Sequence, residues 1–576
     1  MEKADIVIRG GTLVDGSGTA PRRADVAIAN GLILAVGDLS GVDGANAEQI
    51  DATGCHVTPG FVDIHTHYDG QAIWAERLQP SSVHGVTTVV VGNCGVGFAP
   101  CRSEDQDRLI AVMEGVEDIP GAVMADGLDW NWESFGEYLD AVDGRDHDID
   151  VAAYLPHSPL RVFVMGERGV RREPATAEDL AQMRVLVVQA MQAGALGCAT
   201  SRLSYHRTSE GELIPSYGAE REELCVLADA MAQAGGGLLQ VVPDFGAGDV
   251  ESELSLLADV ARRTGVPVTF TGTTGASSSI LRDPLDRYAS EGLNLSGQIF
   301  PRPIGMVMGL DLSWNPFSFC PSYGEVADLP LADRVARMRD PDLRARLLAE
   351  QPDHSRFPLA RQTRNFERTF PIAQTPDYEP SADQSIAAQA ARAGISPEAL
   401  VYDALLELDG QAMLLVAMGN YQDGSLDTLA ELIGHPRTVL GLGDGGAHYG
   451  LICDASYPST ILSHWVRDRA HGRLPIEQAV RELARKPAEV VGLLDRGLLA
   501  PGYKADVNII DLSAVRLFAP EVVRDLPAGG RRLLQRAQGY RATLVAGQVT
   551  YRDGNATDRL PGRLVRGRQQ APRQAA

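Results

Sequence analysis

Two histidines separated by one residue follow a short apolar run near the start of the chain. The run is Gly60-Phe-Val-Asp-Ile64, and the pair is His65 and His67. Side chains at positions i and i+2 of an extended strand point to the same side, so both imidazoles face one space. Imidazole nitrogen is a good zinc ligand. The spacing therefore predicts half of a metal site at the carboxyl end of this strand.

A carboxylate and a thiol are the candidate partners of the histidine pair. Asp444 follows a late apolar run, within Gly441-Leu-Gly-Asp-Gly-Gly-Ala-His448, and Cys94 ends an early run in Val91-Gly-Asn-Cys-Gly95. Asp444 could bind the metal and also accept a proton from the water that the metal activates. A thiolate is a soft metal ligand. The alternatives are an ordinary Asp-Gly turn for Asp444 and a buried structural cysteine for Cys94.

Four further polar side chains are predicted to bind substrate. His206, Arg202 and Arg207 lie just beyond a central apolar run, and His448 lies four residues after Asp444. His206 could coordinate the metal or polarise a substrate carbonyl, and either arginine could hold a carboxylate through two parallel hydrogen bonds. His448 could hydrogen-bond a ligand or orient Asp444. A loop salt bridge is the alternative for the arginines, and a solvent-facing side chain is the alternative for His206.

These residues need a scaffold that brings the ends of distant strands together. Short apolar runs alternate with helical stretches through the middle of the chain, which predicts βα units and a parallel sheet. Eight such runs are present, and eight strands close a barrel. The runs are 60–64, 87–91, 150–155, 196–200, 237–242, 267–270, 295–300 and 438–442. The first and eighth strands are neighbours in a closed barrel, so the histidine pair and Asp444 are expected at one mouth.

The whole chain is predicted to be an α/β protein, with a TIM-type (β/α)8 barrel and a β-sandwich built from both chain ends. Residues 1–58 and 491–561 contain short β runs between Gly-rich turns and form the sandwich, and residues 59–490 form the barrel. A long insertion, 301–437, separates strands seven and eight and is interpreted as a lid or substrate-shaping element, with a separate packed subdomain as the alternative. Residues 562–576 are rich in Arg, Gln, Gly and Pro and are predicted to form a flexible tail.

The composition of the chain excludes some classes of binding partner and indicates the cellular compartment. The 576 residues carry a formal net charge of −24 with a pI near 4.9, which argues against nucleic acid and anionic membranes and leaves a small-molecule substrate. Seven cysteines without a repeated short spacing predict a reducing cytoplasm rather than a disulfide framework. No leader pattern and no apolar run of ~18 residues is present, so neither secretion nor membrane insertion is expected. The oligomeric state stays open, a homo-oligomer included.

The chain resembles the D-aminoacylase (N-acyl-D-amino-acid deacylase) branch of the amidohydrolase superfamily. The resemblance rests on Pro59-Gly-Phe-Val-Asp-Ile-His-Thr-His-Tyr-Asp69, the Pro80–Pro100 segment, His157-Ser-Pro-Leu-Arg161, Gly194-Ala-Leu-Gly197 and the closing Asp495–Asp506 segment. It implies zinc-dependent hydrolysis of N-acyl-D-amino acids, with Cys94 as a zinc ligand where other members of the superfamily use a carboxylated lysine. The only lysines are Lys3, Lys486 and Lys504, and none falls on a predicted barrel strand.

One departure from that branch affects the metal site. Its fifth and sixth strands each supply a histidine to the tightly held zinc, whereas 238–245 and 266–274 contain no histidine here. We therefore predict a site built on His65, His67 and Asp444 with Cys94 as a further ligand, holding one zinc ion, with a second, weakly held ion as the alternative. Gln240 lies near the expected fifth-strand position, but an amide oxygen is a weak zinc ligand.

These features predict a metal-dependent amidohydrolase that cleaves a carbon–nitrogen amide bond in a small substrate. Zinc activates water, and Asp444 carries the proton to the leaving nitrogen. An N-acyl-D-amino acid is the default substrate; another amide, a cyclic imide, a carbamate or an ester is the alternative. The competing hypothesis from another class is a non-catalytic binding or scaffold protein that kept the fold and lost its metal.

Overall fold

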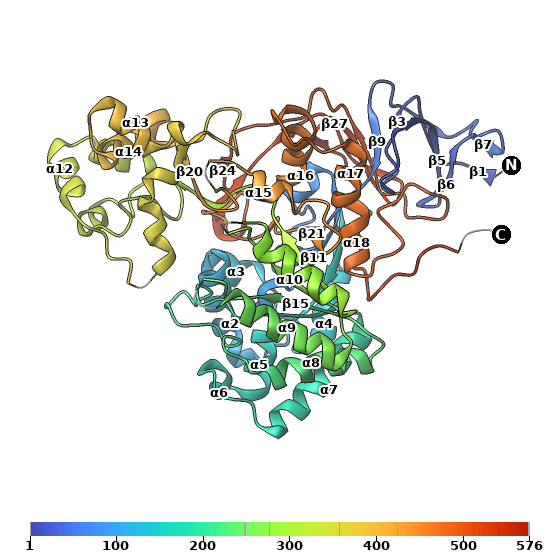
Figure 1. The fold of residues 1–576 in the computed structure, drawn as a ribbon, viewed down its shortest axis with the longest axis horizontal. Helices are drawn as coiled ribbons and strands as arrows, with labels where there is room; N and C mark the ends of the chain where they lie inside the picture. The colour runs from blue at the N-terminus through green and yellow to red at the C-terminus, as the bar shows by residue number, and fades with distance from the viewer. Residues whose placement is uncertain (1, 247–248, 276, 356, 423, 574–576) are drawn as a thin grey trace.

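The computed structural model describes residues 2–246, 249–275, 277–355, 357–422 and 424–573. At its centre, parallel strands alternate with helices that cover them (Figure 1). The strands form two ladders, β10-β11-β12 and β13-β14-β15-β16-β17-β21, in which every neighbouring pair is parallel. Their bounds are β10 Phe61–Asp63, β11 Val86–Val91, β12 Asp150–Ala153, β13 Leu155–Pro156, β14 Gly197–Ser201, β15 Leu238–Val242, β16 Val268–Thr271, β17 Leu295–Ile299 and β21 Thr438–Leu440. Each of the eight predicted runs overlaps these strands.

Backbone hydrogen bonds join the chain segments that follow β10, β11 and β21. The amide of Asp444 donates to the carbonyl of His65 at 3.1 Å, and the amide of His67 donates to the carbonyl of Gly445 at 2.8 Å. On the other side, the amide of Thr66 donates to the carbonyl of Val90 at 3.1 Å. The carboxyl ends of the first, second and last parallel strands are therefore adjacent, although β10 and β21 lie far apart in the sequence.

The central strands are buried on both faces, which explains their continuous apolar runs. All six residues of β11 are buried, and helices α7 (Ala177–Ala193), α8 (Arg221–Gln233) and α9 (Val250–Thr264) pack around the sheet. Local signals set the ends of these helices. Thr176 caps the start of α7 by accepting from the amide of Asp179, and Gly265, with φ 71°, ends α9 in the left-handed region that glycine adopts readily.

The segment between β17 and β21 forms a packed unit with its own hydrophobic core. Its antiparallel sheet has the order β18-β20-β19, and its helices lie at one side of the molecule (yellow in Figure 1). The bounds are β18 Ile304–Gly309, β19 Thr369–Pro371, β20 Met413–Gly419, α11 Leu331–Met338, α12 Pro341–Ala349, α13 Ile386–Ala393 and α14 Pro397–Leu405. The unit contacts the central part through Ser313, whose hydroxyl donates to the carboxylate of Asp118 at 2.8 Å.

The two chain ends form two further sheets, of which the seven-stranded one combines strands from both ends and the four-stranded one contains N-terminal strands alone. The orders are β29-β28-β27-β22-β9-β3-β4 and β6-β5-β2-β8, and side chains from both sheets pack into one core. The bounds are β2 Ile6–Arg9, β3 Thr12–Leu13, β4 Arg22–Arg23, β5 Asp25–Ala29, β6 Leu32–Gly37, β8 Glu48–Asp51, β9 His56–Pro59, β22 Val507–Ile510, β27 Tyr540–Val545, β28 Gln548–Arg552 and β29 Asn555–Ala556. Among the described residues, no helix combines the length and apolar character needed to cross a bilayer.

The end of the chain differs from the flexible tail that its composition predicted. Residues 562–573 lie along the central part, where the amide of Val565 donates to the carbonyl of Val151 and the amide of Gly567 donates to the carbonyl of Gly194, each at 2.7 Å. Leu564 and Val565 are buried. These two apolar side chains and the backbone pairing fix the segment, and its Arg- and Gln-rich composition did not reveal them.

A buried ion pair links the helices that follow the third and fourth parallel strands. Glu223 on α8 accepts from Nε2 of His157 at 2.8 Å and from Arg161, both on α5 (His157–Met165). Burial by itself would raise the pKa of Glu223, but the hydrogen bond from His157 and the charge of Arg161 outweigh burial and lower it to about 2. His157, which belongs to a family-like segment, is therefore held in a structural pair.

We expect Glu223→Gln to lower the free energy of unfolding at pH 7 by about 3–5 kcal/mol, because Arg161 is left buried without its counter-charge. Because the folded pKa is depressed, the carboxylate stabilises the fold above the unfolded pKa of about 4.5, and this contribution is lost as the pH falls toward 2. Urea unfolding at pH 7 and pH 3 measures both effects. The control is Glu222→Gln, in an exposed pair with Arg263, with an expected change below about 1 kcal/mol. Equal losses in both variants at pH 7 would contradict this account.

Candidate metal centre

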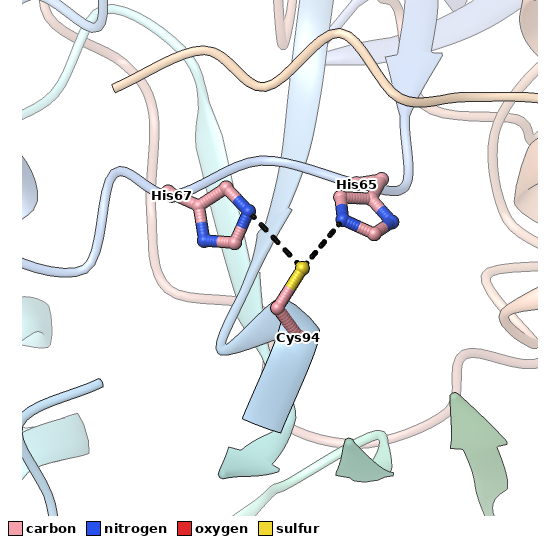
Figure 2. A group of neighbouring side chains, drawn as sticks. All are labelled: His65, His67 and Cys94. Atoms are coloured by element: carbon pink, nitrogen blue, oxygen red, sulfur yellow. Dashed lines mark hydrogen bonds between the residues drawn. The ribbon is translucent and has the colours of Figure 1, made fainter. Parts of the chain in front are cut away.

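Four side-chain donors from three separate parts of the chain converge at the carboxyl ends of β10, β11 and β21. The Nε2 atoms of His65 and His67 lie 3.3 Å and 3.7 Å from Sγ of Cys94, which points between the two imidazoles (Figure 2). The same two nitrogen atoms lie 3.7 Å and 3.8 Å from Oδ1 of Asp444. The histidines and Cys94 are buried, whereas the side chain of Asp444 is 18% exposed. The structure therefore brings all four predicted ligands together.

The distances from the two imidazoles to the thiol and to the carboxylate match the edges of a tetrahedron around a metal ion. Zinc lies about 2.0–2.3 Å from nitrogen, oxygen and sulfur ligands, so tetrahedral ligands lie roughly 3.3–3.8 Å apart. The four donor pairs given above span 3.3 Å to 3.8 Å. Among the described residues, His65, His67 and Cys94 are the group of close metal-binding side chains that the structure contains. That group does not include Asp444. His65, His67 and Cys94 fit one ion, and the Asp444 carboxylate lies beside their imidazoles.

Three residues of the site have left-handed backbone conformations. The φ angles are 56° for Cys94, 47° for Asp444 and 52° for His448. A side chain in this region costs about 1–2 kcal/mol, and such residues gather at functional sites. The turn at Cys94 also needs its glycine neighbour, because a Cβ on Gly95 would lie 2.7 Å from Cα of Thr200. The backbone is thus locally strained at the two residues that carry the thiol and the carboxylate.

Two buried glutamines support the donors from inside the sheet. Nδ1 of His65 lies 2.7 Å from Oε1 of Gln298 on β17, which leaves Nε2 of His65 free to bind a metal. The backbone amide of Cys94 donates to Oε1 of Gln240 on β15 at 3.2 Å. Gln240, whose amide oxygen is a weak zinc ligand, therefore supports the Cys94 turn. Gln298 was missed, although a glutamine within the apolar run of β17 is a signal that could have indicated it.

Glu117 is a buried carboxylate of the site that the sequence analysis also missed. It is the last residue of α2 (Gln106–Glu117) and only 1% exposed. Its Oε1 lies 3.4 Å from Nδ1 of His67, and its Oε2 lies 3.4 Å from Nε2 of His448. Because it comes from a helix end and not from a strand end, the strand pattern that indicated the other ligands gave no sign of it.

His206 faces the same centre from the loop after β14. Burial, followed by the neighbouring imidazoles of His448 and His65, lowers the pKa of His206 to about 3, so it is a neutral imidazole at pH 7. The loop is fixed on α2, because a Cβ on Gly115 would collide with the backbone of Arg207. The same helix thus positions both Glu117 and the loop that carries His206.

The two arginines of this loop have partners within the protein. Nε and Nη2 of Arg202 donate to the carboxylate of Glu253 at 2.8 Å and 3.0 Å. Nε of Arg207 donates to the carbonyl of Ser204 at 3.2 Å, and its Nη1 donates to the carbonyl of Gly211 at 2.8 Å. Arg202 therefore ties the loop to α9, and Arg207 braces the loop internally.

Burial sets the protonation of the four donors. It lowers the pKa of His65 to about 4, against a smaller opposing effect of the hydrogen bond with Gln298, and it lowers the pKa of His67 well below its usual value. It also raises the pKa of the Cys94 thiol and of the Asp444 carboxyl. Neutral imidazole is the form that binds metals, and a nearby cation stabilises thiolate and carboxylate. The chemistry of the donor set therefore fits a divalent cation.

Comparison with known proteins gives consistent matches over nearly the whole chain. The sequence profile described as the amidohydrolase family matches residues 48–551. D-aminoacylase of Alcaligenes xylosoxydans xylosoxydans is 27% identical over 562 residues, or 97% of each chain, and N-acyl-D-glutamate deacylase of the same organism is 29% identical over 526 residues, or 89% of each. The crystal structure of N-acyl-D-glutamate deacylase from Bordetella bronchiseptica, complexed with zinc and a phosphonate inhibitor, has a TM-score of 0.62 and 25% identity and covers 98% of this chain and 100% of that chain.

Proposed function

The chain belongs to the amidohydrolase family and is a hydrolase of carbon–nitrogen bonds other than peptide bonds, and from this premise we propose that it cleaves an amide of a small molecule at a single-metal centre. The convergence of His65, His67, Cys94 and Asp444 carries the proposal, with each histidine Nε2 lying 3.3 Å to 3.8 Å from the thiol and from the carboxylate. Zinc is the proposed ion, because two imidazoles, a thiolate and a carboxylate suit it and because the deacylase structure contains zinc.

We propose that the two parallel ladders form one closed (β/α)8 barrel spanning 59–490. The hydrogen bonds between Asp444 and His65 and between His67 and Gly445 support closure between the first and eighth strands. We also propose that 1–58 and 491–561 form one β-sandwich, and that the insertion 301–437 shapes the mouth of the barrel. The contact of Ser313 with Asp118, next to Glu117, supports that last role.

Each residue around the donors has a separate proposed role in hydrolysis. A bound divalent metal supplies polarisation of the scissile carbonyl and a lowered pKa of water. Asp444 accepts a proton from the attacking water as the carbon–oxygen bond forms, and it delivers that proton to the nitrogen as the carbon–nitrogen bond breaks. Its partial exposure leaves it accessible to substrate, in contrast to the buried histidines. We propose that His206 and His448 hydrogen-bond the substrate, while Arg202 and Arg207 hold the His206 loop.

The names of the relatives direct the first choice of substrates. N-acyl-D-amino acids are the default, and other amides, cyclic imides, carbamates and esters complete the panel. Protein stripped with a chelator and reloaded with zinc is expected to release amine at least about 100-fold faster than the stripped protein, because both water activation and carbonyl polarisation depend on the ion. L-enantiomers serve as the stereochemical control. A zinc-loaded protein that cleaves no member of the panel would refute the proposal.

A binding or scaffold protein without metal is the competing function. The missing histidines of strands five and six motivate it, since 238–245 and 266–274 contain none. Metal analysis of the purified protein separates the two functions: the hydrolase is expected to hold about one equivalent of ion. Less than about a tenth of an equivalent, with no uptake of added zinc, would favour the scaffold.

A further inference from the structure

We propose that Glu117 is the positioning residue of the metal centre, a single buried carboxylate that orients His67 toward the metal and connects it to His448. The inference rests on the metal-dependent function proposed above and adds a residue to it. Neither the strand motifs nor the names of the relatives point to Glu117. The evidence is its contacts, its burial and the way its turn is fixed.

The contacts of Glu117 assign one carboxylate oxygen to each of two imidazoles. Oε1 lies 3.4 Å from Nδ1 of His67, and Oε2 lies 3.4 Å from Nε2 of His448. Among the described residues, both oxygens and Nδ1 of His67 are buried atoms without a hydrogen-bond partner, so these 3.4 Å contacts are the polar contacts that the structure gives them. A carboxylate behind a ligand imidazole fixes its tautomer and ring orientation, so that Nε2 of His67 is presented to the metal. Gln298 does the same for His65.

The turn that holds Glu117 is fixed from two sides. Helix α2 ends because Asp118 adopts a left-handed conformation with φ 51°. The carboxylate of Asp118 accepts from the hydroxyl of Ser313 at 2.8 Å and from the amide of Gly450 at 2.9 Å. The backbone amide of His448 also donates to the carbonyl of Glu117. The insertion and the loop after β21 therefore both determine where this carboxylate lies.

The second imidazole gives Glu117 a connection to the substrate side. The side chain of His448 is 19% exposed, whereas the side chains of Glu117 and His67 are 1% exposed. With Nε2 of His448 directed at Glu117, Nδ1 is the nitrogen left for a ligand. One carboxylate thus aligns a metal ligand in the interior and a substrate-facing imidazole at the mouth.

The test replaces the charge of Glu117 while keeping its shape. We expect Glu117→Gln to raise the zinc dissociation constant, measured by chelator competition, about 10–100-fold. The metal-free variant is expected to melt no lower than the metal-free wild type, because the substitution removes a buried acid whose function is to face the metal. Glu114→Gln is the matched control on the same helix; its carboxylate accepts from the amide of Gly121 at 2.8 Å, and we expect a change in zinc affinity below about 2-fold.

A double-mutant cycle tests the connection to His448. We expect His448→Asn to lower kcat/KM, and we expect this effect to be at least about threefold smaller in the Glu117→Gln background, because residues that act through one contact are not additive. Additive effects would overturn the connection. Unchanged zinc affinity in Glu117→Gln, or loss of folding of its metal-free form while Glu114→Gln folds, would overturn the positioning role. Zinc affinity is measured without substrate, so failure of wild-type hydrolysis tests the proposed function alone.

Discussion

Replacing Asp444 with asparagine is expected to lower kcat/KM by about 10³-fold, because the variant loses the group that moves the proton. Oδ1 of Asp444 lies within 3.8 Å of Nε2 of both His65 and His67, so the side chain lies beside the proposed metal site. Asparagine tolerates the left-handed backbone at this position, where φ is 47°, so the fold should survive. Steady-state kinetics and thermal unfolding of the metal-loaded variant check both parts.

A matched control for Asp444→Asn exists in the insertion. Asp409 also has a left-handed backbone, with φ 53°, and its side chain is 89% exposed. Asp409→Asn makes the same chemical change under the same backbone strain but away from the donors, and its kcat/KM should stay within about twofold of wild type, because surface changes have small effects. Full activity in Asp444→Asn would show that another group moves the proton.

Replacing Cys94 with serine is expected to raise the zinc dissociation constant by about 100-fold or more, because the thiolate is the softest of the four donors. The rate at limiting zinc should fall in parallel, and excess zinc should restore part of it. Serine keeps the size of the side chain in a turn with φ 56°, so the change tests the ligand and not the packing. Chelator competition and metal analysis give the affinity.

Cys198 provides the comparison for Cys94. It is also a free, buried cysteine, but it lies on β14 outside the donor group. Cys198→Ser should lose stability, because burying a hydroxyl without its own hydrogen bond costs about 1–3 kcal/mol, and should keep the zinc affinity of the wild type. If Cys94→Ser behaved in the same way, Cys94 would be a packed residue.

The residues at strand ends were predictable because sheet geometry is regular. A strand alternates its side chains, which places His65 and His67 on one side, and parallel strands end at one edge, which places Asp444 near them. The apolar runs of strands buried on both faces marked all eight positions. The resemblance to deacylases then indicated Cys94, whose thiol lies between the two imidazoles.

Residues set by helix ends and loops were not predictable in this way. Glu117 reaches the centre only because α2 ends in a turn that Ser313 and Gly450 fix through Asp118, contacts between residues far apart in the sequence. Arg202 is comparable: a substrate carboxylate and Glu253 on α9 would satisfy it equally, and only the fold shows that Glu253 is its partner. Such contacts depend on how loops pack, and a sequence pattern does not encode that.

A metal-bound crystal structure with anomalous scattering measured at the zinc edge tests the central claim most directly. The account predicts one strong peak per chain, about 2.0–2.3 Å from Nε2 of His65, Nε2 of His67, Sγ of Cys94 and Oδ1 of Asp444. No peak within bonding distance of the two histidines, in crystals grown with excess zinc, would contradict it.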